Sequence, residues 1–248
     1  MNAYLLAAGL GSRLRPHTYH TPKCLIDIHG TPLLGWWLKL FEQHGIKRVL
    51  INTHHLANKV ETYLDIIRPK TSLEITTVHE PVLLGSAGTL LQNRFFISSS
   101  EDFLIAYADI LTLVNLTKMK DAHQAFKKKG ALLTMGLFHT SHPSSCGIVT
   151  LDSFQLITNF IEKPKDPASN LSNAGIYIAS PTIFDYLPNT VPAKKALDIG
   201  FDLLPFLVNQ MYGFHIEEYL RDIGHLDSYS EALETFPVTL SSPFSSPT

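Results

Sequence analysis

The sequence predicts an α/β fold with a doubly wound sheet, and three observations support this prediction. Strand and helix patterns alternate through residues 3–138, as expected for βαβ units with parallel strands. The 248 residues are 45% hydrophobic and 17% charged, which suits one large domain or two small ones around a buried core. The later part of the chain is less regular and has a hairpin pattern, so we expect a smaller β-rich subregion there.

The elements of the first half follow from the spacing of apolar residues. Short apolar runs predict buried strands, whereas apolar residues three and four positions apart predict helices. Thr31 can cap a helix that has Pro32 in its first position, and Gly45 can end it. The expected strands are residues 3–7, 48–52, 73–78, 103–108 and 131–138, and the expected helices are 32–44, 56–67 and 116–129.

The second half is expected to begin with a hairpin and to end with a helix. Asp227 can cap that last helix, which would run to residue 233. Residues 237–248 are rich in Ser and Pro, so we expect a disordered tail after a folded domain over residues 1–236. The expected strands are residues 147–151, 156–162, 172–178 and 214–220, and a further helix is expected at 199–209.

Composition and charge exclude several classes of protein. The net charge of −2 gives no broad basic surface, so we expect no nucleic-acid partner. No run of about 18 apolar residues predicts a membrane span, and the N-terminus has no signal-peptide pattern, so a cytoplasmic location is expected. Cys24 and Cys146 have neither metal nor redox spacing, which predicts buried free thiols.

The loop after the first strand suits a polyphosphate. Gly9 and Gly11 can take positive φ and let a ligand touch the backbone, where successive N–H groups form an anion site. Arg13 and Lys23 add positive charge, whereas Arg15 can simply face solvent. The loop lacks the third glycine of the Gly-x-Gly-x-x-Gly fingerprint, and the chain has no P-loop motif, so neither common nucleotide motif applies.

Asp109 follows the apolar strand expected at residues 103–108. Ligands of doubly wound sheets bind at the carboxyl ends of the strands. The glycine loop and Asp109 both lie at such ends, so we expect them to converge.

Residues 6–18 read Leu-Ala-Ala-Gly-Leu-Gly-Ser-Arg-Leu-Arg-Pro-His-Thr, and Pro-Lys follows at 22–23 and Gly-Thr-Pro-Leu at 30–33. This ordered set resembles the hallmark of the sugar-1-phosphate nucleotidylyltransferase family, closest to its mannose/heptose-1-phosphate guanylyltransferase group. The resemblance implies a Rossmann-like doubly wound mixed sheet of the nucleotide-diphospho-sugar transferase type, with a small β-rich sugar-binding subregion. It also implies that residues 1–236 form a nucleotidyltransferase catalytic domain.

The resemblance further implies transfer of a nucleotidyl group from an NTP to a sugar 1-phosphate, with release of pyrophosphate. In this family two carboxylates hold Mg²⁺, and they correspond to Asp109 and to Asp222 in Arg-Asp-Ile-Gly. Ala108 stands where the family has glycine, and His225-Leu226 stands where it has Thr-Pro. The catalytic residues implied by the resemblance are Arg13, Lys23, Asp109, Lys163 and Asp222.

The sugar-phosphate subsite is implied by three short motifs. Glu162-Lys163-Pro164 resembles the family's Glu-Lys-Pro, where the lysine holds the sugar phosphate and the glutamate accepts hydrogen bonds from sugar hydroxyls. Asn173 corresponds to an asparagine on the sugar, and the backbone of Gly147 to a glycine that meets it. Cys146 departs from the family's tyrosine, which leaves a smaller side chain beside the expected sugar pocket.

Base choice is implied by residues 80–89, Glu-Pro-Val-Leu-Leu-Gly-Ser-Ala-Gly-Thr, which resemble a segment of guanylyltransferases that act on mannose or heptose 1-phosphates. GTP is therefore expected, with UTP, dTTP and CTP as alternatives. A catalytically silent nucleotide- or sugar-binding regulator is a further alternative. The expected partners are small-molecule substrates only, an oligomer is possible, and the sugar is left open. The expected nucleotide-binding residues are Leu6, Ala8, Gly9, Gly11, Ser12, Arg13, Lys23, Glu80, Gly85, Ser86 and Ala87.

Overall fold

The computed structural model describes residues 1–192 and 195–237, which fall into two structural units. Unit 1 comprises Met1–Val82, Tyr107–Leu113 and the stretch that begins at Glu218, and unit 2 comprises Leu83–Ala106 and Val114–Glu217. The expected tail lies outside the described residues except for its first residue, Pro237.

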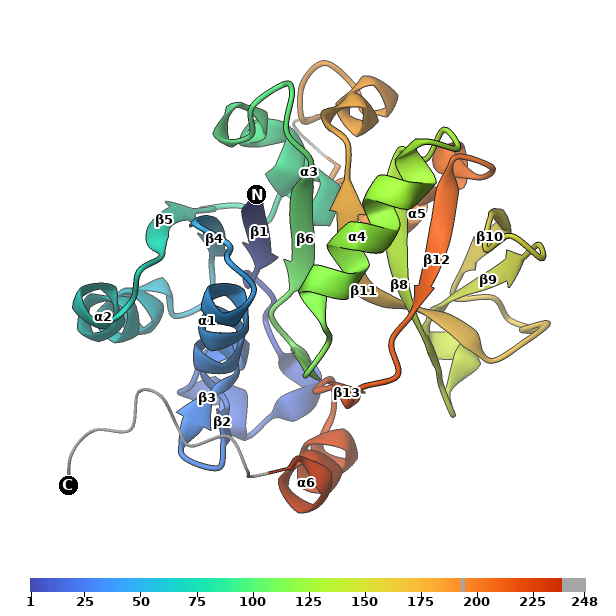
Figure 1. Ribbon diagram of the computed structural model, residues 1–248. Coiled ribbons are helices and arrows are strands. Elements are labelled where there is room, and N and C mark those ends of the chain that lie inside the picture. Colours follow the sequence, from blue (N-terminus) through green and yellow to red (C-terminus); the bar gives the residue numbers. More distant parts are fainter. Residues whose placement is uncertain (193–194, 238–248) are drawn as a thin grey trace. The chain divides into compact units, whose positions relative to one another are not determined.

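Unit 1 is built on three parallel strands that alternate with helices (Figure 1). The strands are β1 (Asn2–Leu6), β4 (Arg48–Thr53) and β5 (Glu74–His79), with β4 between the other two. Helix α1 (Leu33–Gln43) joins β1 to β4, and α2 (Ala57–Ile67) joins β4 to β5. The interior strands are apolar because a parallel sheet is covered on both faces.

The start of α1 differs from the prediction. Pro32 is its N-cap and no side chain caps it, whereas Thr31 lies in the short strand β3 (Thr31–Pro32), which pairs with β2 (Asp27–Ile28). The predicted end is confirmed, since α1 stops at Gln43 and Gly45 has φ +67°.

The remaining elements of unit 1 place one short strand beside another from the opposite half of the sequence. Strand β7 (Ile110–Thr112) pairs antiparallel with β13 (Leu220–Asp222). Helix α6 (Leu226–Thr235) follows β13, and its N-cap is His225, whose ring accepts a hydrogen bond from the Ser228 N–H at 3.2 Å. The predicted Asp227 cap is therefore wrong, because the helix starts before that residue.

Part of the core of unit 1 is a cluster of buried apolar side chains in which α1, β7 and α6 pack together with residues from the segment after β1. Its members are Leu14, Ile26, Ile28, Leu33, Trp36, Leu111, Ile223, Ala232 and Phe236.

Unit 2 is organised around the long strand β11 (Leu171–Ala179), which pairs antiparallel with three other strands. These are β6 (Phe103–Tyr107), β8 (Leu133–His139) and β9 (Gly147–Leu151). Strand β10 (Ile157–Glu162) forms the predicted hairpin with β9, and β12 (Met211–His215) runs parallel to β8 (Figure 1). Parallel and antiparallel pairs thus occur together, which confirms the predicted mixed α/β fold.

The helices of unit 2 are α3 (Ser86–Gln92), α4 (Leu116–Lys127) and α5 (Ile199–Asp202). The helix predicted at 199–209 is wrong beyond its first turn, because Pro205 cannot donate the next helical hydrogen bond and the chain forms a 3₁₀ turn there. Likewise the strand predicted at 214–220 is two strands, β12 and β13. The 3₁₀ turns of both units are Ser12–Leu14, His17–Tyr19, Lys23–Leu25, Arg68–Lys70, Arg94–Phe96, Pro143–Ser145, Pro181–Tyr186 and Leu204–Leu207.

The free thiols match the prediction only in part. Cys24 is buried, and burial raises its pKa to about 12, whereas Cys146 is only half-buried. Among the helices of the described residues, none combines the length and the apolarity that a membrane crossing needs.

Candidate active site

The glycine loop of unit 1 uses its two glycines differently. Gly11 has φ +63°, and its carbonyl oxygen accepts hydrogen bonds from the Leu14 N–H at 2.9 Å and the Thr18 hydroxyl at 2.7 Å. A Cβ on Gly11 would lie 2.8 Å from Thr18 Cγ2, so glycine is required there by conformation and by space. A Cβ on Gly9 would meet nothing within 4 Å and Gly9 does not have positive φ, so its backbone borders open space.

A buried polar network holds the start of this loop. The Ala7 N–H donates to Asn52 Oδ1 at 2.7 Å, and Asn52 Nδ2 donates to Glu80 Oε1 at 2.9 Å. Asn52 and Glu80 are only 4% and 3% exposed. Glu80 was expected to bind nucleotide, and the structure places its carboxylate against Asn52 below the loop. Asn52 was not predicted, and its one signal is a polar residue directly after the apolar run Val49–Ile51 of β4.

The predicted convergence of the glycine loop and Asp109 is confirmed within unit 1. The Ala108 N–H donates to the Leu6 carbonyl oxygen at 3.0 Å, where β1 ends. Lys23, which follows the loop, forms an ion pair with Asp109. The Lys23 side chain is 10% exposed and that of Asp109 is 31% exposed, so a buried ammonium faces a partly open carboxylate.

Asp222 reaches the same place through β13. The Ile223 N–H donates to the Asp109 carbonyl oxygen at 2.9 Å, and the β7–β13 register sets Asp222 opposite Ile110. A Cβ on Gly224 would lie 2.8 Å from Asp222 Oδ2, so this glycine leaves room for the carboxylate. The pairing of the two short strands therefore brings Asp109 and Asp222 together.

The electrostatics of this cluster suit a polyanion with a counter-cation. Asp222 has one side open to solvent and is otherwise closely surrounded by protein. This partial burial is the largest cause that raises its pKa, and the Asp109 carboxylate raises it further, while Lys23, Arg13 and His225 oppose the rise. Arg13 itself is exposed in its 3₁₀ turn, and Arg15 places its guanidinium 5.1 Å from the centre of the Tyr19 ring. The carboxylates of Asp109 and Asp222 and the cations of Lys23 and Arg13 thus act on one another electrostatically.

These residues fit Mg²⁺. Among the described residues no group of three or more His, Cys, Asp or Glu side chains could hold a metal, so the protein would supply the two carboxylates alone. Mg²⁺ in proteins commonly takes one or two carboxylates and completes its octahedron with phosphate oxygens and water. Because like charges raise the pKa of Asp222, a cation between Asp109 and Asp222 would be favoured there.

In unit 2 the end of the β9–β10 hairpin holds Glu162 and Lys163. Glu162 pairs with Gly147 across the hairpin, and a Cβ on Gly147 would lie 2.6 Å from Glu162 Oε2. Lys163 has φ +48°, a left-handed conformation that costs a side-chain-bearing residue of order 1–3 kcal/mol and is concentrated at functional sites. Its N–H donates to the Cys146 carbonyl oxygen at 3.1 Å.

The two side chains of this pair differ in exposure. Lys163 Nζ lies 3.7 Å from Glu162 Oε1, and the lysine side chain is 55% exposed against 13% for the glutamate. Burial raises the pKa of Glu162; Lys163 opposes the rise and the nearby Asp198 carboxylate adds to it. The pair thus presents an exposed ammonium beside a partly buried carboxylate.

Asn173 lies in β11, where the register with β8 shifts between Asn173 and Tyr177. Its Nδ2 donates to the Tyr177 hydroxyl at 2.6 Å, and its Oδ1 accepts from the Gly175 N–H at 2.9 Å. Burial raises the pKa of Tyr177 far above its ordinary value, and the Glu162 carboxylate adds to the rise, so Tyr177 is a neutral donor or acceptor beside that group. The structure therefore brings Gly147, Glu162, Lys163 and Asn173 together.

The segment predicted to read the base starts α3 and is bonded to residues that the sequence analysis missed. Gly85 is the N-cap with φ +79°, and the N–H groups of Ala87 and Gly88 donate to the Leu197 carbonyl oxygen at 2.9 and 3.2 Å. Ser86 Oγ donates to Asp198 Oδ2 at 3.0 Å. The only sequence signal for Asp198 was an acidic residue at the start of a predicted helix.

The expected site residues divide between the two units. Glu80 and Gly85, which the sequence analysis read as one base-binding segment, belong to different units. Unit 1 holds Leu6, Ala8, Gly9, Gly11, Ser12, Arg13, Lys23, Glu80, Asp109 and Asp222. Unit 2 holds Gly85, Ser86, Ala87, Gly147, Glu162, Lys163 and Asn173.

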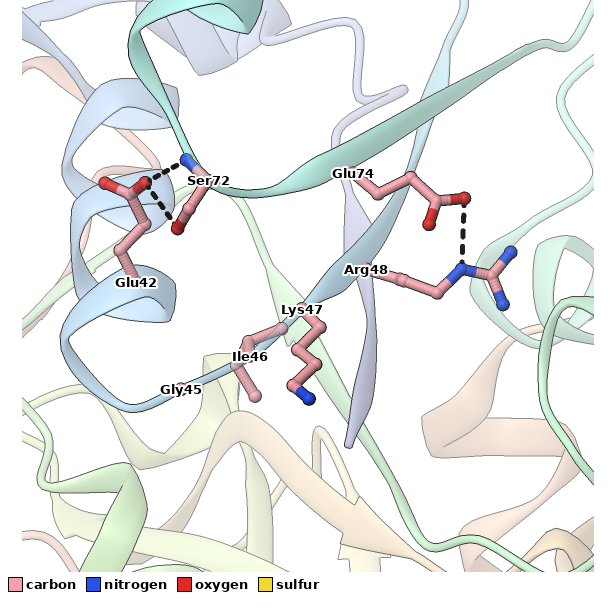
Figure 2. Close-up of a pocket in the computed structure, with 7 residues that line it drawn as sticks. All are labelled: Glu42, Gly45, Ile46, Lys47, Arg48, Ser72 and Glu74. Atoms are coloured by element: carbon pink, nitrogen blue, oxygen red, sulfur yellow. Dashed lines mark hydrogen bonds and ion pairs between the residues drawn. The ribbon is translucent and has the colours of Figure 1, made fainter.

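A separate groove of about 540 Å³ lies at the amino ends of β4 and β5 (Figure 2). Its acidic side chains already have partners: Glu42 accepts from the Ser72 N–H at 2.6 Å and from its hydroxyl at 3.1 Å, and Glu74 lies 3.1 Å from Arg48 Nε. Parallel sheets bind ligands at the carboxyl ends instead. None of the expected site residues lines this groove, which is formed by Glu42, Gly45, Ile46, Lys47, Arg48, Ser72 and Glu74.

Comparisons with known proteins agree on a family. The model of the family described as Nucleotidyl transferase matches residues 2–237. The UTP–glucose-1-phosphate uridylyltransferase of Synechocystis sp. is 32% identical over 249 residues, which cover 94% of this chain and 62% of that protein. The mannose-1-phosphate guanylyltransferase catalytic subunit beta of Drosophila melanogaster is 31% identical over 225 residues, which cover 90% of this chain and 59% of that protein.

The fold is shared with a solved structure as well. The crystal structure of UDP-glucose pyrophosphorylase complexed with UDP-glucose has a TM-score of 0.79 at 22% identity, covering 95% of this chain and 97% of that one. The chain spans about six tenths of the length of the two curated relatives. The match over residues 2–237, together with relatives above 30% identity, shows that this chain belongs to the Nucleotidyl transferase family.

Proposed function

We propose that this chain is a sugar-1-phosphate nucleotidylyltransferase, which joins an NTP to a sugar 1-phosphate and releases pyrophosphate. The observation that carries the proposal is the cluster of Lys23, Asp109 and Asp222 beside an open glycine loop, with Arg13 acting on it. Such a cluster suits a polyphosphate and a divalent cation. The family and both relatives support the same reaction class. The catalytic domain is proposed to span residues 1–236.

In the proposed reaction an oxygen of the sugar phosphate attacks the α-phosphorus of the NTP, and the bond to the leaving pyrophosphate breaks. No protein nucleophile is needed, because the phosphate monoester is already anionic. The work of the protein is to position two polyanions and to stabilise the charge that develops between them. Asp109 and Asp222 would hold Mg²⁺, which when bound supplies positive charge to the phosphate oxygens.

Each side chain has a defined part in this scheme. The Arg13 guanidinium would contact the β- and γ-phosphates through two hydrogen bonds and stabilise the leaving pyrophosphate. The buried Lys23 ammonium orients Asp109 through their ion pair and places a point charge beside the reacting phosphates. Lys163 would bind the sugar phosphate. Glu162 would accept hydrogen bonds from sugar hydroxyls, and Asn173 would accept or donate them.

For the base we propose GTP. The support is the likeness of residues 80–89 to the guanylyltransferase segment and the similarity to the Drosophila guanylyltransferase subunit. The Synechocystis relative is named for UTP, so UTP is the first alternative.

One experiment tests both the proposed reaction and the proposed base. It measures pyrophosphate release by the full chain with Mg²⁺, using four NTPs against a panel of sugar 1-phosphates. Release that depends on both substrates is expected, with GTP and a manno- or heptose-type sugar phosphate the best pair. Release with another NTP would support the proposed reaction and contradict the choice of GTP. No release with any pair, while NTP binding is measurable by calorimetry, would contradict the reaction and favour a regulatory protein.

A further inference from the structure

The carboxylate of Glu162 lies in a narrow slot between two glycines of unit 2. A Cβ on Gly147 and a Cβ on Gly200 would each lie 2.6 Å from Glu162 Oε2. Contacts below 3.0 Å are not tolerated by a real side chain without movement, so neither position accepts alanine unless Glu162 shifts. Gly147 was expected at this subsite, whereas Gly200 was not.

The chain around Gly200 also borders Lys163. The Phe201 ring centre lies 5.7 Å from Lys163 Nζ, within the range of a cation–π contact, although the Phe201 side chain is 55% exposed. Residues 198–201 thus pass along both members of the Glu162–Lys163 pair.

Asp198 fixes the conformation of this turn. Its Oδ1 accepts from the Gly200 N–H at 2.8 Å and the Phe201 N–H at 3.2 Å, and its own N–H donates to Asp202 Oδ2 at 2.8 Å. The turn is therefore set by a carboxylate that acts on the backbone of the residue packed against Glu162.

The other oxygen of Asp198 connects the turn to α3. Ser86 Oγ donates to Asp198 Oδ2 at 3.0 Å and accepts from the Ile199 N–H at 2.8 Å. The Leu197 N–H donates to the Leu84 carbonyl oxygen at 2.8 Å, so the two segments are bonded in both directions. The space beside Gly85, where a Cβ would stand, is filled by the backbone of Leu197.

We propose that Gly200 and Asp198 determine sugar selection: Gly200 closes the slot that fixes the Glu162 carboxylate, and Asp198 is the positioning residue that holds Gly200 there. A carboxylate confined on two sides accepts hydrogen bonds best from hydroxyls at set positions, which discriminates between sugar 1-phosphates that differ in hydroxyl stereochemistry. Ser86 makes the base-reading segment part of the same support. This inference rests on the proposed function and deepens its sugar-phosphate half.

The main test is Gly200→Ala in the full chain, assayed with the best NTP and sugar 1-phosphate pair from the pyrophosphate matrix. Gly200 lies in α5 and does not have positive φ, so alanine is conformationally allowed. The atoms in its way belong to the ends of two side chains, the Glu162 carboxylate and, at 3.1 Å, Asp198 Oδ1. We expect KM for the sugar phosphate to rise roughly tenfold or more, as displacement of a positioning group by about 1 Å does. We expect KM for the NTP to change less than twofold and the melting temperature to be nearly unchanged.

A double-mutant cycle shows whether Gly200 acts through Glu162. In a Glu162→Ala background the two closest obstacles to the added methyl group of Gly200→Ala are gone and only Asp198 Oδ1, 3.1 Å from it, remains, so the further rise in KM should be much smaller. Asp198→Asn should shift the same KM, and the matched control Asp185→Asn, which removes an exposed carboxylate from the same unit, should not. If Asp198→Asn fails to fold, the Gly200→Ala cycle decides alone.

Two outcomes would overturn the inference. Equal changes in both KM values would contradict it, and so would a Gly200→Ala effect of undiminished size in the Glu162→Ala background. In either case wild-type turnover would leave the proposed reaction standing. Absence of wild-type turnover with every pair would contradict the proposed reaction, and the inference would fall with it.

Discussion

The candidate site residues of unit 1 and those of unit 2 handle charge in opposite ways. In unit 1 the carboxylates of Asp109 and Asp222 lie among the cations Lys23 and Arg13, and an open glycine backbone stands beside them. In unit 2 a single carboxylate, Glu162, is confined between two glycines beside one exposed ammonium. The first arrangement suits a flexible polyanion held by charge, whereas the second suits a rigid ligand distinguished by shape. In the proposed reaction, affinity for the NTP would therefore come from unit 1 and selectivity for the sugar phosphate from unit 2.

The largest expected effect tests the charge-based half. Asp109→Asn removes one carboxylate of the pair and breaks the ion pair with Lys23, so Mg²⁺-dependent turnover should fall roughly a hundredfold or more. Pyrophosphate release at saturating substrates measures this, and Asp227→Asn, an exposed carboxylate on α6, is the control. A near-normal rate would remove Asp109 from the metal site.

A smaller effect should separate the two halves. Lys163→Ala removes the free ammonium of unit 2, so KM for the sugar phosphate should rise about tenfold or more, the loss of a charged hydrogen bond of roughly 1.5–3 kcal/mol. KM for the NTP should stay within about twofold, because Arg13 and Lys23, the cations proposed to bind the NTP phosphates, lie in unit 1. A change confined to KM for the NTP would contradict the assignment of the NTP to unit 1 and the sugar phosphate to unit 2.

Asp102 is a third kind of carboxylate, which lies among hydrogen-bond donors and outside the candidate site. Burial alone would raise its pKa, but the neighbouring His123 ring, whose Nε2 lies 3.7 Å from Asp102 Oδ2, and hydrogen bonds from Lys127 and Gln124 lower it well below its ordinary value. A lowered folded-state pKa contributes stability that is present above the ordinary pKa and is lost as pH falls through the folded value. Asp102→Asn should therefore lower stability at pH 7 by about 1–3 kcal/mol. Denaturant unfolding measures this loss, which should shrink in acid, and turnover at 25 °C should be unchanged.

The smallest effect concerns the stability cost of Glu162. Because its pKa is raised, the folded state binds the proton more tightly, so stability falls as pH rises from the ordinary pKa to the raised one. Glu162→Gln removes that fall, and melting curves from pH 4 to 8 should show an equal or higher melting temperature for the variant at neutral pH. A clearly lower melting temperature at neutral pH would mean that the ionised carboxylate is stabilising. Use of the sugar phosphate should nevertheless be weakened.

Local signals in the sequence were sufficient for much of the fold. Strand β4 was predicted because an apolar run must be buried, and the end of α1 because Gly45 can adopt positive φ. The convergence of Asp109 with the glycine loop followed from the rule that strand ends share one edge of a sheet. Features that follow from the local sequence pattern were therefore predictable.

The parts that were missed depend on contacts between distant segments. Asn52 supports the glycine loop through a hydrogen bond to Ala7, and nothing in its own neighbourhood reveals that bond. Gly200 matters only because the β9–β10 hairpin delivers Glu162 against it. The His225 cap was missed because histidine is an uncommon cap, so Asp227 was the stronger local candidate.

The antiparallel pairing of β7 with β13 has a consequence for the order in which the molecule becomes competent. A nascent chain that has emerged only as far as β12 already contains the glycine loop, Lys23 and Asp109, yet it lacks the strand that carries Asp222. Contacts of such large sequence separation form late, because the loop-closure entropy is lost before the contact is gained. The carboxylate pair would therefore be assembled near the end of folding, so that the metal site proposed here would be completed only after all of unit 2 has been synthesised.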